Sequence, residues 1–144
     1  MSPALKTYFT DYAAFHATPG NKACHSVGIP LIVLTLFSFL AAVPLAEVAG
    51  FRLTLAEALL VAVSLFYFTL DAPLALMMLA ASAALDAAGR FIPIPAALGL
   101  FALGWILQFV GHYVYEKRSP AFLRNAAHLL VGPLWILAKA TGRA

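Results

Sequence analysis

Long apolar runs, separated by short polar segments, are the feature that most constrains how this chain can fold. Of its 144 residues, 63% are hydrophobic and only 10% are charged, and the mean hydropathy is +0.92. A soluble domain of this size does not need so much apolar surface. The sequence therefore predicts an integral membrane protein of the all-α class, a helical bundle that forms one domain over residues 1–144.

The apolar runs predict about four transmembrane helices, since each span needs roughly 20 apolar residues. Prolines, glycines and the tight return at Asp71-Ala-Pro73 separate the runs. The third run is short and rich in alanine, as close helix packing in a bilayer prefers. The expected spans are residues 27–48, 53–70, 74–88 and 96–114.

Both ends of the chain are expected to lie at the membrane surface. Within residues 1–26, an amphipathic helix with an aromatic face is expected over residues 3–17, because apolar residues recur there at steps of three and four. Thr18-Pro19-Gly20 ends it, and Asn21 is a suitable N-cap for the next helix. Residues 121–139 contain an apolar run interrupted by Gly132-Pro133, which is too short to span. We expect an interfacial or re-entrant helix pair there.

The basic residues support this count and predict an orientation. With four spans, both termini and the Asp71 turn share one side, and only Arg52 and Arg90 lie on the other. By the positive-inside rule both termini are cytoplasmic. The alanine-rich composition favours a bacterial inner membrane, with the endoplasmic reticulum as the alternative. The basic residues on the side of the termini are Lys6, Lys22, Lys117, Arg118, Arg124, Lys139 and Arg143.

Several classes of function lack their characteristic residues. The single cysteine, Cys24, excludes an internal disulfide and any site built from several cysteines. No Gly-rich phosphate loop precedes a helix, and no serine lies in a Gly-x-Ser-x-Gly motif. Basic residues are scattered rather than gathered with aromatic ones, which argues against nucleic acid as a partner.

Polar residues gather at the end of the fourth expected span. Gln108, His112 and Glu116 are four residues apart, so on an α-helix they share one face. An imidazole and a carboxylate one turn apart can bind a metal or move a proton, and the amide can hold a ligand oxygen. In the alternative interpretation His112 and Glu116 mark the membrane surface, with Glu116 paired to Lys117 or Arg118.

Two more histidines are expected near this face. A turn at Pro19-Gly20 lets His16 and His25 converge, and the span count places both at the cytoplasmic rim with His112 and Glu116. Imidazole and carboxylate ligands suit iron(II), zinc, manganese or nickel, so the residue types alone leave the metal open.

Three further residues are candidates for the same site, each with a simpler alternative. Asn21 can hydrogen-bond a metal ligand or cap a helix. Asp71 can join the site or cap the helix that follows it. His128 can face the site or be solvated on an amphipathic helix.

Two blocks of sequence resemble the fungal 2-hydroxy fatty acid dioxygenase family, and the similarity covers nearly the whole chain. The first runs from Tyr12 to Pro30. The second, over residues 105–121, has the pattern Trp-x-x-Gln-Phe-x-Gly-His-x-x-x-Glu-Lys-x-x-Pro-Ala. The resemblance implies an Fe2+-dependent enzyme that uses dioxygen to convert long-chain 2-hydroxy fatty acids to chains one carbon shorter.

The resemblance also implies which residues carry the chemistry. His16, His25 and His112 match the family's histidines and are the expected iron ligands, and Glu116 follows in the same motif. We expect catalytic roles for Glu116 and Gln108. His128 falls where the fungal proteins have no histidine.

A 2-hydroxy acid can chelate iron through its carboxylate and hydroxyl groups while its alkyl chain lies among the spans and membrane lipid. Lys22, Lys117 or Arg118 can attract its carboxylate.

Three other functions stay open at this point. One is a zinc-dependent lipid hydrolase with Glu116 as general base. Another is a haem-binding bundle with His25 and His112 as axial ligands. The third is a scaffold with structural histidines. The sequence leaves the oligomeric state and the preferred chain length open.

Overall fold

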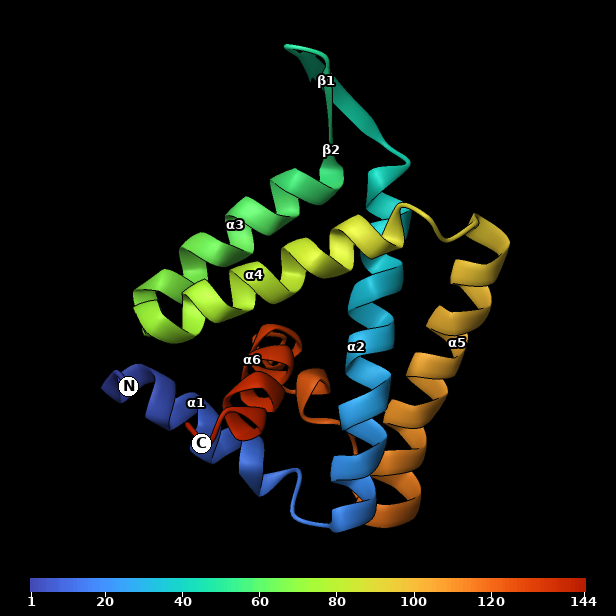
Figure 1. Ribbon diagram of the computed structural model, residues 1–144. Coiled ribbons are helices and arrows are strands. Elements are labelled where there is room, and N and C mark those ends of the chain that lie inside the picture. Colours follow the sequence, from blue (N-terminus) through green and yellow to red (C-terminus); the bar gives the residue numbers. More distant parts are fainter. The chain divides into compact units, whose positions relative to one another are not determined.

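The computed structural model describes residues 1 to 144 and contains six α-helices, one β-hairpin and two short helical turns (Figure 1). The chain divides into two compact units. Unit 1 comprises Met1–Pro30 and Leu103–Ala144, and unit 2 comprises Leu31–Ala102. Helices α2 (Pro19–Ala41) and α5 (Ile94–Val110) pass from one unit into the other. The expected all-α class is confirmed, with the hairpin as an addition.

Unit 1 begins with helix α1 (Pro3–Ala14), which lies within the expected amphipathic segment. Ser2 caps it by accepting a hydrogen bond from the backbone N–H of Leu5 at 3.1 Å. The buried face of α1 lies in contact with helix α6 (His128–Ala140). The apolar residues of this face are Leu5, Phe9 and Tyr12.

Helix α2 begins at Pro19, so the N-cap role expected for Asn21 is wrong. Proline suits the first position of a helix, because its missing N–H has no partner there in any case. Thr18 is the capping residue: its hydroxyl accepts a hydrogen bond from the backbone N–H of Asn21 at 3.3 Å. The Asn21 side chain is thereby free to point elsewhere.

Helix α5 changes character at its end. It continues without a break into a π-helical segment, η1 (Gly111–Glu116), and Lys117 closes that segment in the left-handed conformation with a φ of 55°. A π-helical turn holds more residues than an α-helical one and is frequently found at functional sites. The polar end of the fourth expected span lies in this segment.

The C-terminal part of unit 1 differs from the expected helix pair. A single 3-10 turn, η2 (Ala121–Leu123), precedes α6, and α6 runs through Gly132-Pro133 without a break. A proline inside a helix removes one backbone hydrogen bond. Here the helix continues beyond it, with Val131, Leu134 and other apolar residues buried.

Unit 2 contains the largest departure from the expected spans. The expected first span continued to residue 48, but α2 ends at Ala41, and an antiparallel hairpin of β1 (Pro44–Val48) and β2 (Phe51–Thr54) follows. The turn between the strands places Ala49 at φ 50° and Gly50 at φ 79°. Two successive residues with positive φ characterise the tight turn that joins twisted strands, and glycine adopts such a conformation without strain.

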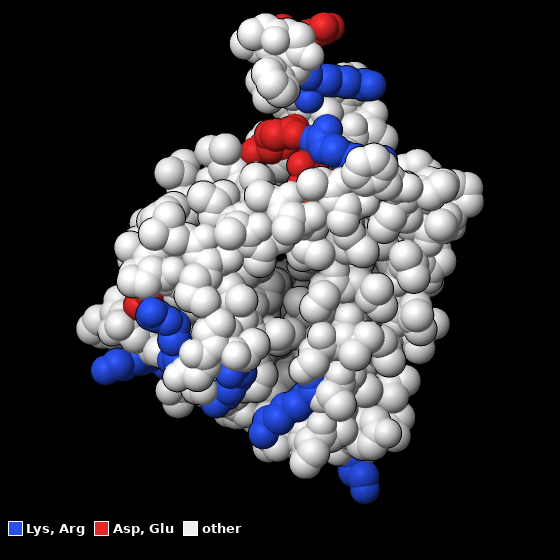
Figure 2. Space-filling model, in the orientation of Figure 1, with Lys and Arg blue, Asp and Glu red and all other residues white.

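Two helices complete unit 2 and lie side by side, α3 (Leu55–Leu70) and α4 (Ala72–Gly89) (Figure 1). Thr54 and Glu57 form a capping box at the start of α3. At the same end of the pair, Arg90 follows the end of α4 and forms ion pairs with Glu57 and Asp86. Figure 2 shows these opposite charges side by side near the hairpin, whereas most of the visible face is uncharged.

Three helices are long and apolar enough to span a membrane. By length and composition these are Pro19–Ala41, Ala72–Gly89 and the continuous helix Ile94–Glu116. Helix α3 coincides with the expected second span but has only 16 residues. At 1.5 Å per residue it is about 24 Å long, somewhat less than a hydrocarbon core of about 30 Å.

Candidate metal centre

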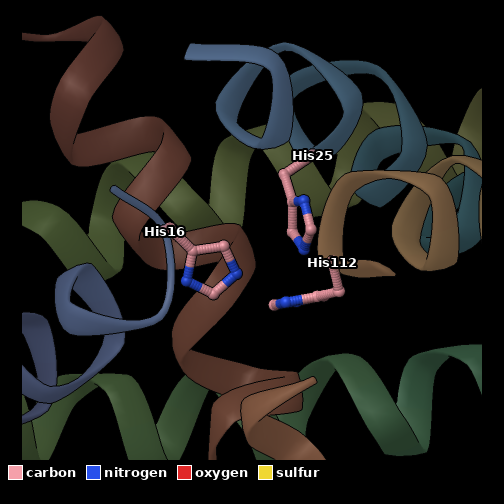
Figure 3. A group of neighbouring side chains, drawn as sticks. All are labelled: His16, His25 and His112. Carbon is pink, nitrogen blue, oxygen red and sulfur yellow. The ribbon is translucent and has the colours of Figure 1, made fainter. Parts of the chain in front are cut away.

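Three histidines from separate segments meet in the interior of unit 1 (Figure 3). His16 lies in the turn after α1, His25 in the second turn of α2, and His112 in η1. Their exposed fractions are only 2%, 3% and 1%. The turn that begins α2 thus brings His16 and His25 together, as expected from the sequence.

The three rings form a nearly equilateral triangle. The distances between ring centroids are 4.5 Å for His16 and His25, 4.9 Å for His16 and His112, and 4.8 Å for His25 and His112. The ring planes are close to perpendicular to one another, with angles of 76°, 70° and 87°. Each ring offers one nitrogen to a group of atoms that all lie within 4.8 Å of one another.

Backbone carbonyl groups orient two of the rings. Nδ1 of His16 donates to the carbonyl oxygen of Tyr12 at 2.7 Å, and Nδ1 of His25 donates to that of Asn21 at 2.9 Å. Because Nδ1 carries the proton in both rings, Nε2 of each neutral ring has a lone pair to share. This arrangement, in which the second nitrogen holds a hydrogen bond, is the one found in metal-bound histidines.

His16 is held in its neutral form. Desolvation by burial is the largest cause and lowers the pKa of His16 from 6.5 to about 4, with a smaller lowering by His112. Its hydrogen bond to Tyr12 acts in the opposite direction. At neutral pH the imidazole therefore carries no proton on Nε2 and can serve as a ligand.

The chemistry of these donors fits a divalent transition metal. Nε2 of His16 is buried and has no hydrogen-bond partner, and the same is true of Nδ1 of His112. Unpaired buried polar atoms are rare in folded proteins and commonly indicate a ligand or an ion. Imidazole nitrogens bind such a metal at about 2.0–2.1 Å, so an ion held by nitrogens up to 4.8 Å apart would require the rings to move slightly closer together.

Gly111, the first residue of η1, lies close to α2 beside the histidines. A Cβ atom added at Gly111 would collide with the side-chain oxygen of Asn21 and would lie 3.2 Å from Cε1 of His25. Glycine is therefore required by space at this position. The close approach places His112, the next residue, against the other two rings.

Glu116 binds the start of α2 rather than a histidine ring. Its Oε1 accepts from the backbone N–H of Ala17 at 3.0 Å, and its Oε2 accepts from the N–H and hydroxyl of Thr18 at 3.1 and 2.8 Å. Oε2 also accepts from Nδ2 of Asn21 at 3.1 Å. Through these hydrogen bonds Glu116 positions the turn that follows His16. The catalytic role expected for Glu116 stays a prediction.

Gln108 is buried one helical turn before His112, with an exposed fraction of 4%. Its Nε2 has no hydrogen-bond partner and lies against the backbone of Gly28, where a Cβ atom would collide with it. Gln108, His112 and Glu116 thus contact Gly28, His25 and Asn21 in turn. The three polar residues share one face, as their spacing predicts.

Comparison with known proteins shows to which family this sequence belongs. A family described as "2-hydroxy-palmitic acid dioxygenase Mpo1-like" matches residues 3–144. The chain belongs to this family. It is 33% identical over 138 residues to the 2-hydroxy-palmitic acid dioxygenase MPO1 of Saccharomyces cerevisiae, which covers 92% of this chain and 77% of the yeast protein. No solved structure matches.

The remaining candidates of this Mpo1-like protein have other contacts. Asp71 belongs to unit 2, where its Oδ1 accepts from the backbone N–H of Leu74 at 3.0 Å and caps α4. His128 begins α6, and its Nε2 lies 2.7 Å from Oδ2 of Asp11. Neither belongs to the group of potential metal ligands. Asn21 supports the group through its carbonyl oxygen, which holds His25.

Three further residues of the centre contribute to it without having been predicted from the sequence: Tyr12, Thr18 and Gly111. The ring of Tyr12 stacks on His16, Thr18 joins Glu116 to α2, and Gly111 makes room for Asn21. Tyr12 was expected only as part of an apolar face. Its position four residues before His16 was the available signal, because residues so spaced are neighbours on a helix.

Proposed function

We propose that this Mpo1-like protein is an Fe2+-dependent dioxygenase that converts long-chain 2-hydroxy fatty acids to acids one carbon shorter. Membership of the family and the 33% sequence identity to the yeast enzyme support the function of a fatty acid dioxygenase. The structural observation that carries the metal assignment is the group of three buried imidazoles, two of them oriented by backbone carbonyl groups.

The reaction balances with dioxygen as the only oxidant. One 2-hydroxy acid and one O2 give the shortened acid, one CO2 and one water. The bond between C1 and C2 breaks, C2 becomes the new carboxyl carbon, and the four electrons released reduce O2. No separate reductant is needed, so a site for a nicotinamide or flavin cofactor is not required.

The protein supplies three buried histidine side chains as ligands, and hydrogen bonds orient two of them. His16, His25 and His112 are the residues that would hold Fe2+, and the ion supplies the one-electron chemistry that lets O2 react. Nδ1 of His16 and Nδ1 of His25 stay protonated, because each donates a hydrogen bond to a backbone carbonyl oxygen. Since the rings are buried, bulk water is excluded from the reacting groups.

Basic residues near the ends of the ligand-bearing helices attract the substrate carboxylate. Lys22 and Lys117 are exposed and flank the histidine segments. The Arg118 side chain is less available to the substrate, because it donates a hydrogen bond to the carbonyl oxygen of Ala14 at 2.9 Å and lies over the Phe15 ring. The alkyl chain lies among apolar helices in a four-span arrangement with both termini in the cytoplasm, in a bacterial inner membrane.

The same geometry argues against two rival functions. A zinc hydrolase with Glu116 as general base needs a carboxylate oxygen that faces water or substrate, but both oxygens accept hydrogen bonds from residues 17–21. A haem with His25 and His112 as axial ligands needs room for a porphyrin between two rings whose centroids are 4.8 Å apart.

Metal analysis and oxygen uptake test the proposal together. Protein purified without oxygen is expected to contain iron, and adding a long-chain 2-hydroxy fatty acid is expected to start oxygen consumption with release of one CO2 per O2. Alanine at His16, His25 or His112 should abolish both. His128→Gln is the matched control, since it changes a buried histidine outside the group. Normal iron retention in the triple alanine variant contradicts the assignment.

A further inference from the structure

Polar atoms without partners are concentrated around the histidine centre. Six buried side-chain nitrogen or oxygen atoms lack a hydrogen-bond partner, and five of them belong to unit 1. Such atoms reduce stability unless a ligand, an ion or water satisfies them. The five atoms are Nε2 of His16, Oδ1 of Asn21, Nε2 of Gln108, Nδ1 of His112 and Nδ1 of His128.

Gln108 is the one residue among these five whose unpaired atom, as placed in the structure, is an amide nitrogen. An imidazole nitrogen can be a donor or an acceptor, and Oδ1 of Asn21 accepts only, whereas the side-chain NH2 of glutamine can only donate. A buried donor of this kind calls for an oxygen acceptor. A metal ion cannot satisfy it.

Two helices place this donor one turn away from the metal ligands. On α5, Gln108 comes four residues before His112. On α2, Gly28, which lies against the Gln108 amide, comes three residues after His25. Residues so spaced are neighbours on a helix. The donor therefore lies beside the histidine triangle, on the side away from Glu116.

Because Gly28 has no side chain, the side-chain amide of Gln108 has room beside the backbone of α2. A Cβ atom there would collide with Nε2 of Gln108 and would lie 2.9 Å from the carbonyl oxygen of Gly104. The two backbones thus pack closely at the level of Gln108. A glutamine held in this way has little freedom to turn towards solvent.

We propose that Nε2 of Gln108 donates a hydrogen bond to a head-group oxygen of the 2-hydroxy fatty acid while the histidine-bound metal holds that head group. The inference rests on the proposed function and assigns a substrate-binding residue to it. A neutral donor suits this position, because it binds an oxygen without adding a charge next to the ion. The acceptor is the carboxylate or the 2-hydroxyl group.

Ligand binding to zinc-loaded protein tests the role of Gln108 without turnover, since zinc does not activate O2. Gln108→Met keeps the length of the side chain and removes the donor. It is expected to weaken binding of a long-chain 2-hydroxy fatty acid about ten-fold, the loss of one hydrogen bond to a charged or polar head group. The zinc content should stay at the wild-type value.

Two further ligands identify the acceptor. If the variant and the wild type bind the unsubstituted fatty acid equally well, the 2-hydroxyl group is the acceptor. If they bind the corresponding 1,2-diol equally well, the acceptor is the carboxylate. Equal binding of all three ligands by the two proteins overturns the inference, and so does loss of zinc from the variant.

Thermal stability provides a second readout. Removing an unpaired buried donor is expected to raise the melting temperature of the ligand-free protein by a few degrees, whereas a structural glutamine would lower it on substitution. Gly28→Ala, which pushes on the amide, should weaken binding as well. Gly99→Ala is its control, since nothing lies within 4 Å of that position.

The outcomes separate this inference from the proposed function. If the wild type binds no 2-hydroxy acid and consumes no oxygen with iron, both fail. If the wild type binds and oxidises the acid and Gln108→Met does the same with equal affinity, only the role of Gln108 fails.

Discussion

The ring of Tyr12 stacks on the ring of His16, with centroids 3.9 Å apart and planes inclined by 11°. The carbonyl oxygen of the same tyrosine accepts the Nδ1 proton of His16. One residue therefore fixes both the tautomer and the plane of this imidazole. Burial raises the pKa of the Tyr12 hydroxyl, so the tyrosine is neutral in this position.

Removing the Tyr12 ring should weaken metal binding. Tyr12→Leu keeps the backbone acceptor but lets the His16 ring turn, and supporting contacts of this kind are worth about 10- to 100-fold in metal affinity. Tyr12→Phe keeps the stacked ring and should bind within about two-fold of the wild type. Competitive titration with a chelator measures both. An equal loss in the two variants would show that the hydroxyl, not the ring, is responsible.

Glu116→Gln separates a positioning role from a catalytic one. The amide that replaces one carboxylate oxygen faces N–H groups, so the turn before α2 loses hydrogen bonds to a charged acceptor, each worth about 1.5–3 kcal/mol. We expect lower stability and weaker metal binding, but an unchanged rate of oxygen uptake per bound iron. A lower rate per iron at full occupancy would instead support the catalytic role. Glu47→Gln, on the exposed hairpin, is the matched control.

The sequence predicts the meeting of the three histidines better than it predicts the elements that carry them. The expected break at Pro19-Gly20 and the expected common depth in the membrane predict that His16, His25 and His112 meet, and their rings do lie together. Side-chain spacing alone shows neither that η1 is π-helical nor that Gly111 packs closely against Asn21. The support given by Tyr12 is local, because its ring and its carbonyl group contact a histidine four residues later.

The hairpin shows another limit of reading apolar runs. Residues 42–48 are apolar apart from Pro44 and Glu47, so hydropathy extends the first span through them. The backbone conformations of Ala49 and Gly50 decide otherwise, because two positive φ values reverse the chain and pair β1 with β2. A hydropathy pattern does not predict such a turn here, because one of its two positions is occupied by alanine, which is apolar and not typical of a turn.

The metal-free protein should lose stability as the pH is lowered from about 6.5 to about 4. Burial keeps the folded-state pKa of His16 at about 4, whereas in the unfolded chain it is 6.5. The unfolded state therefore binds more protons in this window, and the contribution of His16, at most roughly 3 kcal/mol, is present above pH 6.5 and lost towards pH 4. Denaturant unfolding at several pH values measures it.

His16→Gln is the control for this pH dependence, because glutamine does not titrate. Its free energy of unfolding should vary less between pH 4 and 6.5 than that of the wild type. Identical slopes in the two proteins would mean that His16 is protonated in the folded state.

Labelling of single cysteines tests the four-span arrangement, in which α3 crosses the membrane despite its 16 residues. Cys24 is the only cysteine, so Cys24→Ser gives a clean background for Lys6→Cys, Glu47→Cys, Ala72→Cys and Ala144→Cys, all at exposed positions. With four spans, an impermeant maleimide should reach Glu47→Cys from outside and the other three only after the membrane is opened. If α3 and α4 both stay on the outer surface, Ala72→Cys reacts together with Glu47→Cys, and Ala144→Cys stays protected because His25 and His112 still meet on one side of the membrane.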